Sequence, residues 1–224
     1  MKSAFTFQDL YVGLSPFEAP ATFSLLPYSE LAHGVWYPRG GMYSVVEALV
    51  ALALQAGVRF QFGMPVAEII TRAQRAAGVR LDDGSEIGAD VVLANADLPY
   101  VYDRLLPPNG VAKSLLRKQY SCSAVSFFWA LDHRCSALAP HTLFLADDAR
   151  ANYDAITHGQ GLPANPSLYV HAPARLDPSV APAGHDSVTA IVPVSHLDDA
   201  GRLNWDELRQ RGASTCSVAS PASA

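Results

Sequence analysis

The sequence has little of several features, and each shortage removes a class of function. It holds three cysteines in 224 residues and no C-x-x-C pair, which argues against a disulfide framework and favours a reducing, intracellular compartment. Its seven histidines show neither H-x-x-x-H nor H-E-x-x-H spacing, so no metal site is expected. With a net charge of −5 the chain has no basic field, which argues against a nucleic-acid partner.

Long hydrophobic runs are also missing. The longest run, Val45–Leu54, is interrupted by Glu47 and is too short to cross a bilayer. Residues 1–20 include Asp9, Glu18 and two prolines, and they do not resemble a secretory signal. We therefore expect no membrane span and no export signal in this sequence.

The first half of the chain alternates expected helices and strands. Half of the residues are hydrophobic and 17% are charged, as in a globular protein with a core. A helix with apolar residues on nearly every face is predicted after Gly41; it should be buried on most sides and end at Gly57. Strands are predicted at Val58–Phe62, Pro65–Ile70, Gly78–Leu81 and Ser85–Ile87. An Asp-Gly turn joins the last two, and Ala89–Ala94 is typical of a strand buried in a parallel sheet.

The second half predicts an antiparallel sheet with one helical side. Helices are expected over Asp97–Leu105 and Val111–Tyr120, and strands over Ala124–Leu131, His141–Leu145, Ser167–His171 and Ser187–Val194. Residues 205–209 read as the first turns of a helix that is then cut short, and residues 212–224 as a disordered, low-complexity tail. The whole pattern indicates an α/β (α+β) fold.

Two turns are candidates for ligand contact. Gly40 and Gly41 precede a helix, where glycine lets backbone approach a ligand, free amides can face an anion, and Arg39 can reach a phosphate or ribose. The alternative is a tight turn without a ligand. Asn95 and Ala96 follow an apolar strand, where ligands of α/β sheets bind; the alternative is a simple helix start capped by Asp97.

Several spaced motifs resemble one family, the bacterial and fungal type of phytoene desaturase. They are Ala4–Gln8, Ser15–Phe17, Ala19–Thr22, Gly34–Gly41, Asp90–Asp97, Ser121–Trp129, His141–Asp147, Asp177–Ser179 and Ala181–Gly184. The resemblance runs from about residue 4 to about residue 209. It implies an FAD-dependent enzyme of carotenoid biosynthesis that removes hydrogen from C–C bonds of a long polyene.

The resemblance also implies an amine-oxidase-like architecture, in which a split Rossmann-like FAD-binding domain accompanies an antiparallel-sheet substrate domain. Residues 1–54 and 98–211 would belong to the substrate domain, and residues 55–97 to the FAD-binding domain. By position, Val66 would lie near the adenine, and Asn95 and Ala96 near the ribose or pyrophosphate. The G-x-G-x-x-G fingerprint and the second glycine-rich flavin segment are absent from this sequence, so we expect the chain alone to bind FAD poorly and to be inactive.

Aromatic residues are the candidates for contact with an apolar substrate. Each has ordinary core packing as its alternative. They are Phe23, Tyr28, Trp36, Tyr37, Phe127, Phe128 and Trp129. No pair of titratable residues suggests a general acid and base, so the catalytic residues are unknown; hydride loss to a flavin requires mainly placement. Cys122 is read either as a nucleophile or, in the favoured interpretation, as a small buried apolar residue.

Two other functional classes stay open alongside the desaturase. One is another flavin enzyme of the same fold, such as an amine oxidase or a carotenoid isomerase, and the other is a flavin-free escort protein for prenyl groups or lipids. The expected partners are a phytoene-like carotene and a peripheral membrane surface, and homo-oligomerisation is left open. For the membrane surface we nominate the helix Val111–Tyr120, where Leu115 and Leu116 lie beside Lys113, Arg117 and Lys118.

Overall fold

The structure is a computed structural model that describes residues 14–115, 117–118, 120–158, 162–163, 165–196 and 204–218. The chain divides into two compact units: the first joins Met1–Ala51 to Tyr120–Ala224, and the second is Leu52–Gln119. The motifs Ala4–Gln8 and the first part of the chain up to residue 13 lie outside the described residues.

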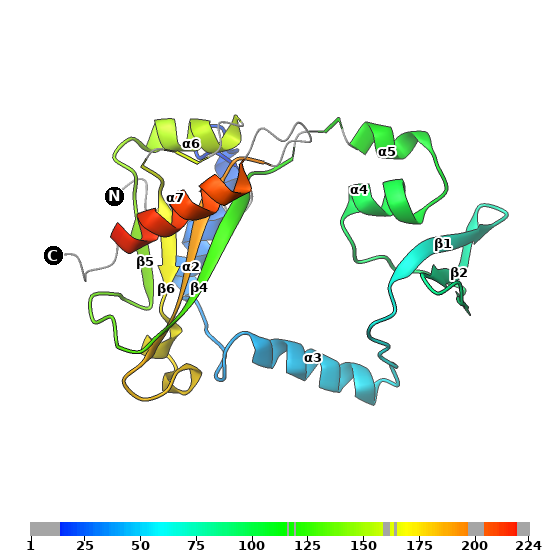
Figure 1. The fold of residues 1–224 in the computed structure, drawn as a ribbon, viewed down its shortest axis with the longest axis horizontal. Helices are drawn as coiled ribbons and strands as arrows, with labels where there is room; N and C mark the ends of the chain where they lie inside the picture. The colour runs from blue at the N-terminus through cyan, green and yellow to red at the C-terminus, as the bar shows by residue number, and fades with distance from the viewer. Residues whose placement is uncertain are drawn as a thin grey trace. The chain divides into compact units, whose positions relative to one another are not determined.

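The first unit is built on a four-stranded antiparallel sheet (Figure 1), as the sequence predicts. Its strands lie in the order β4-β7-β6-β5. Their bounds are β4 Ser123–Leu131, β5 His141–Phe144, β6 Leu168–His171 and β7 Asp186–Val194. Alternate residues of β7, Val188, Ala190 and Val192, are fully or almost fully buried and form the core with Phe127 and Trp129 of β4.

Helices and 3-10 turns surround this sheet. A 3-10 turn, η2 Ala21–Ser24, leads into α2 Leu25–His33, and α6 Ala149–Thr157 packs through Tyr153 against Tyr169 of β6. The carboxylate of Asp148 caps α6 by accepting a hydrogen bond from the Ala151 N–H at 3.0 Å. Helix α6 was not predicted from the sequence; it is only nine residues long and mixes alanines with polar residues.

A buried ion pair closes one end of the sheet. Asp186, the first residue of β7, has no solvent-exposed side-chain surface, and both guanidinium NH groups of Arg175 donate to its carboxylate. Arg175 ends the 3-10 turn η4 Pro173–Arg175, and its Nε also donates to the Leu138 carbonyl at 3.2 Å. The Cys135 N–H donates to Asp186 at 2.8 Å, so the β4–β5 loop is tied to the same carboxylate.

The second unit holds a smaller antiparallel sheet of β1 Val66–Arg72, β2 Arg75–Leu81 and β3 Glu86–Gly88. The predicted Asp-Gly turn joins β2 to β3, with Gly84 at φ +84°. Helices follow this sheet in the chain. Helix α4 Leu98–Tyr100 continues into the π-helix η3 Val101–Leu105, and α5 Gly110–Leu115 comes next. Val101 and Leu105 pack on Ile69 of β1, which is why residues 98–119 join this unit and not the larger sheet.

Glycine is required at Gly78 of β2. Its φ is +146°, and a Cβ built there would lie 2.2 Å from the Ile87 carbonyl oxygen of the neighbouring strand. Any side chain would force β2 and β3 apart. The close approach of the two strands therefore depends on this glycine.

Two predicted strands are wrong. Val58–Phe62 and Ala89–Ala94 have no strand assignment, and the apolar Val91 and Leu93 are 81% and 92% exposed. A strand of a parallel sheet needs neighbours on both edges for its N–H and C=O groups. No strand among the described residues lies beside these two segments. They therefore have no partner with which to form a sheet, despite their apolar composition.

The predicted helices differ from the structure in three places. The helix after Gly41 forms as α3 Tyr43–Gln55, followed by Gly57 at φ +83°, but none of its residues is buried, because no described element covers it. The helix expected over Val111–Tyr120 ends at Leu115.

No helix in the described part of the chain is long and apolar enough to span a bilayer.

The third difference lies at the C-terminal side. Helix α7 runs from Trp205 to Val218, well into the tail expected to be disordered, while residues 219–224 lie outside the described residues. Asn204 explains the start, because its side-chain oxygen accepts hydrogen bonds from the N–H groups of Asp206 and Glu207. Both acidic residues also favour the positive end of the helix dipole. Once begun, the helix gains one hydrogen bond for each added residue.

We predict that Arg175→Met destabilises the chain by about 3 kcal/mol, because it leaves the buried Asp186 carboxylate without its charged partner. Chemical denaturation measures the change. Arg104→Met is the matched control: Arg104 pairs with Asp103 at the surface, and its loss should cost less than about 1 kcal/mol. Equal losses in the two variants would contradict the assigned role of the buried pair.

The pH dependence of this pair has a definite sign. Burial by itself would raise the pKa of Asp186, but the hydrogen bonds from Arg175 and Cys135 outweigh it and the pKa is lowered. The stabilisation is therefore complete above the unfolded-state pKa of about 3.9 and is lost as the pH falls through the lower folded-state value.

Candidate functional site

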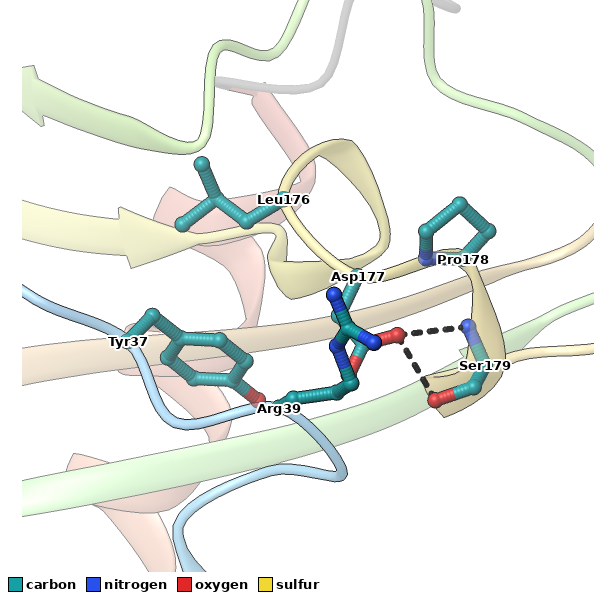
Figure 2. Close-up of a pocket in the computed structure, with 6 residues that line it drawn as sticks. All are labelled: Tyr37, Arg39, Leu176, Asp177, Pro178 and Ser179. Carbon is teal, nitrogen blue, oxygen red and sulfur yellow. Dashed lines mark hydrogen bonds between the residues drawn. The ribbon is translucent and has the colours of Figure 1, made fainter.

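The site is organised by one carboxylate, that of Asp177. Its Oδ2 accepts a hydrogen bond of 2.6 Å from the Gly40 N–H, which lies 137 positions earlier in the chain. Its Oδ1 accepts from the N–H and Oγ of Ser179 at 2.9 and 2.7 Å, as the dashed lines in Figure 2 show. The hydrogen bonds from the Ser179 side chain and then from Gly40 lower the pKa of Asp177, so the carboxylate is charged at neutral pH.

A pocket of about 550 Å³ opens beside this carboxylate. Its lining comes from the loop before α3 and from the segment joining η4 to η5 Pro178–Val180. The lining residues are Tyr37, Arg39, Leu176, Asp177, Pro178 and Ser179 (Figure 2). The pocket therefore combines one cation, one anion, a phenol, a hydroxyl and two apolar side chains.

Aromatic and imidazole rings stand behind Tyr37. The Tyr37 ring lies 5.4 Å from that of His171, which stacks on His141 at 4.8 Å across the β5–β6 pair. His171 Nδ1 donates to the Pro140 carbonyl at 2.9 Å, and His141 Nδ1 lies 2.7 Å from the Tyr169 hydroxyl. Burial and the neighbouring His171 lower the pKa of His141, while burial and Asp177 raise the pKa of Tyr37. Both shifts favour the neutral form, that of the His141 imidazole and that of the Tyr37 hydroxyl.

Tyr37 was among the residues nominated from the sequence, but Asp177, His141 and His171 were not. Asp177 and the two histidines lie far from the glycine pair in sequence, and only the sheet register places His141 opposite His171. The available signal was the alternation of Tyr169 and His171 along one strand, which puts both side chains on the same face.

The glycine pair is arranged differently from the sequence-based expectation. Gly40 and Gly41 have φ of +85° and +88°, so each occupies a conformation that other residues rarely adopt. Their N–H groups are already used, by Asp177 and by the Pro38 carbonyl. A ligand approaching this turn would therefore meet the bare Cα atoms and the Arg39 guanidinium. A Cβ on Gly41 would lie 3.4 Å from the Tyr37 hydroxyl.

The other three predicted cofactor residues lie in the second unit. Val66 opens β1, which pairs only with β2 among the described strands, and the register shifts directly after it. Asn95 and Ala96 are exposed in the loop that precedes α4. Asp97 is the N-cap residue of α4, as expected, but its side chain makes no capping hydrogen bond. For Val66, Asn95 and Ala96, the role in holding a cofactor stays a prediction.

The predicted substrate residues have different surroundings. Trp36 is 87% exposed and donates from Nε1 to the His33 carbonyl, while Tyr37 lines the pocket. Phe127 and Trp129 stack on each other at 5.5 Å and pack against the core of the four-stranded sheet. Phe128, on the opposite face of β4, is 77% exposed. Of the seven aromatic residues nominated for substrate contact, only Tyr37 lines this pocket.

Comparison with known proteins identifies similar sequences and similar solved structures. The family model described as flavin containing amine oxidoreductase matches residues 2–200. Phytoene desaturase of Neurospora crassa is 44% identical over 93% of this chain and 37% of its own length. The zeta-carotene-forming phytoene desaturase of Myxococcus xanthus is 42% identical over 88% of this chain and 38% of its own length.

More distant relatives extend the same picture. The 4,4'-diapolycopene oxygenase of Methylomonas is 35% identical over 90% of this chain and 41% of its own length. An oxidoreductase structure from Methanosarcina mazei superposes with a TM-score of 0.67 at 18% identity, covering 98% of this chain and 50% of that chain. The chain thus spans little more than a third of the length of the curated relatives, and the structural likeness shows a shared fold.

We predict that Asp177→Ala releases the loop that holds Arg39. Without its acceptor, the Gly40 N–H loses its only contact with the η4–η5 segment that the structure describes, so the loop should open more often. Trypsin should then cleave the Arg39–Gly40 bond about tenfold faster. Losing a charge-assisted hydrogen bond raises the population of the open loop by about that factor, and cleavage follows this population. Peptide mass spectrometry measures the rate.

Asp147→Ala is the matched control, since that carboxylate accepts a surface hydrogen bond from Asn165 and has no contact with the loop. Its cleavage rate at Arg39 should equal that of the unmodified chain. An unchanged rate in Asp177→Ala would show that the clamp does not hold the loop.

Proposed function

The chain belongs to the flavin-containing amine oxidoreductase family, and we propose that it is a region of a phytoene desaturase. The proposed reaction removes hydrogen from C–C bonds of a long polyene and transfers it to FAD in carotenoid biosynthesis. The observation that carries the proposal is 44% and 42% identity to two phytoene desaturases over about nine tenths of the chain. The match to a flavin family argues against a flavin-free escort function.

FAD is part of this proposal, and the described residues fit it in one respect. The turn at Gly40 and Gly41 offers bare Cα atoms that let a flat ring system approach closely, and Arg39 supplies a cation at the same pocket. By the family resemblance, Arg39 would reach a phosphate or ribose of the cofactor beside Gly40 and Gly41. Val66 would lie near the adenine, and Asn95 and Ala96 near the ribose or pyrophosphate. When bound, FAD supplies the acceptor for the hydride that leaves the substrate.

The chain's own residues contribute placement. Asp177 fixes the loop from Trp36 to Gly41, and the raised pKa of Tyr37 keeps its hydroxyl protonated beside the pocket. Leu176 and Pro178 give the pocket an apolar side suited to a hydrocarbon. No described pair of groups in the pocket is arranged as a general acid and base, which agrees with a reaction that needs orientation more than proton transfer.

A chimera tests the proposal. The 221 matched residues of the Neurospora crassa phytoene desaturase are replaced with those of this chain, and the chimera is expressed in cells that accumulate phytoene. We expect phytoene to fall and longer conjugated chromophores to appear in the visible spectrum. A folded, flavin-loaded chimera that leaves phytoene unchanged would contradict the proposed activity.

Glycine variants of the same chimera test the site. Gly41→Val should abolish turnover, because the side chain enters the pocket edge next to Tyr37. Gly34→Val is the matched control: its φ is also positive, +76°, but no atom lies within 4 Å of the added Cβ. Equal activity of the two variants, at equal protein level, would remove Gly41 from the site.

Peripheral membrane attachment is the second part of the proposal, because a hydrocarbon substrate dissolves in bilayers and hardly in water. Lys113, Arg117 and Lys118 are exposed and close in sequence, which supports attraction to anionic head groups worth about 1 kcal/mol for each charge. Leu115 is buried within its unit, and Leu116 lies outside the described residues. The attraction we propose is therefore electrostatic.

Liposome co-sedimentation tests this attachment. The chain should bind anionic vesicles, and the triple variant Lys113→Glu, Arg117→Glu, Lys118→Glu should lose most of the binding, as should the unmodified chain at high salt. The charge-matched control is the triple variant Arg59→Glu, Arg72→Glu, Arg75→Glu. These arginines are exposed, and the control should bind normally. Equal binding by both triple variants would show that this segment is not the anchor.

A further inference from the structure

A cysteine, a histidine and an aspartate lie together in the β4–β5 loop. The Sγ of Cys135 is 3.9 Å from Nε2 of His133, and Nδ1 of the same ring is 2.8 Å from the Asp132 carboxylate. This order gives each group a distinct role: a carboxylate that holds Nδ1–H fixes the tautomer in which Nε2 accepts a proton. The group next to Nε2 of His133 is the Cys135 thiol.

The backbone of Cys135 is held in place from outside the loop. Its N–H donates to Asp186 of β7 at 2.8 Å, and its carbonyl accepts from the Arg175 guanidinium. Both partners belong to the buried ion pair at the end of the sheet. The thiol is therefore presented from a fixed point, even though Asp132 and His133 are exposed.

Several charged groups lie around Cys135. Arg175 lies close enough to Cys135 for the two to interact electrostatically, and the Asp186 charge is matched by two hydrogen bonds from the same guanidinium. The other charged or titratable groups nearby are Arg134, close to Asp186, and His185, close to Asp132. A thiolate beside an arginine and an imidazole is the arrangement that makes cysteine nucleophilic.

Cys122 provides the contrast within the same chain. It is partly buried like Cys135, but it packs on Tyr153, and burial raises the pKa of its thiol. This agrees with its interpretation as a small apolar residue. Of these two thiols, only that of Cys135 has an imidazole and a guanidinium beside it in the described part of the chain.

We propose that Cys135 is a modification site, a nucleophilic thiol that reacts with small carbon electrophiles, with His133 as its base and Asp132 as the residue that orients the imidazole. With an alkyl halide such as iodoacetamide, the sulfur forms a C–S bond as the C–I bond breaks and iodide leaves. The thiol proton passes to Nε2 of His133. No oxidant or further reactant is needed.

Competitive alkylation of the full chain with limiting iodoacetamide tests the proposal. Peptide mass spectrometry gives the rate at each cysteine, and at pH 7 Cys135 should react about tenfold faster than Cys122. In urea the cysteines should react at equal rates, which shows that the difference comes from the fold. Equal rates at Cys135 and Cys122 in the folded chain would overturn the proposal.

Variants separate the base from the fold. His133→Asn should slow alkylation of Cys135 about tenfold at pH 7, because the nitrogen that accepts the thiol proton is lost. Asp132→Asn should slow it less, because it leaves the base in place. His158→Asn, at the end of α6, is the matched control and should leave the rate unchanged. An unaltered rate in His133→Asn, with unaltered thermal unfolding, would remove the histidine from the site.

Discussion

The hydrogen bond from the Gly40 N–H to the Asp177 carboxylate is the contact on which the pocket depends. It joins a loop near the start of the chain to a turn that follows β6, and no other described hydrogen bond links these two segments. Asp177 also accepts hydrogen bonds from Ser179, so the same carboxylate closes the turn and holds the loop. The pocket walls, Tyr37 and Arg39 on one side and Leu176 to Ser179 on the other, are adjacent because of this one acceptor.

A second carboxylate, that of Asp186 at the start of β7, lies nine positions later and also holds a loop in place. Asp186 and Arg175 tie down the β4–β5 loop through the Cys135 backbone. The segment from η4 to the start of β7 thus carries two anions, and each of them organises a loop from elsewhere in the chain. One bounds the pocket proposed for the flavin, and the other positions the thiol proposed to react with electrophiles.

Local patterns predicted the elements that satisfy their own hydrogen bonds or pair with a neighbour in this chain. The four strands of the larger sheet alternate or carry long apolar runs, and each was located to within two residues. The Asp-Gly turn at Gly84 followed from its backbone preference. Val58–Phe62 and Ala89–Ala94 have the same apolar composition but no strand beside them, so composition alone misplaced them.

The sequence by itself determined the family, the antiparallel sheet, the strained glycine pair and the nomination of Tyr37 and Arg39, because these depend on residues close together in the chain. Only the tertiary structure decided that Asp177 would occupy the Gly40 amide, that His141 would stack on His171, and that Phe127 and Trp129 would serve the core. Those outcomes depend on strand register and on contacts between distant segments. No local propensity encodes such contacts, since the free energy that fixes them is gained only when the sheet has formed.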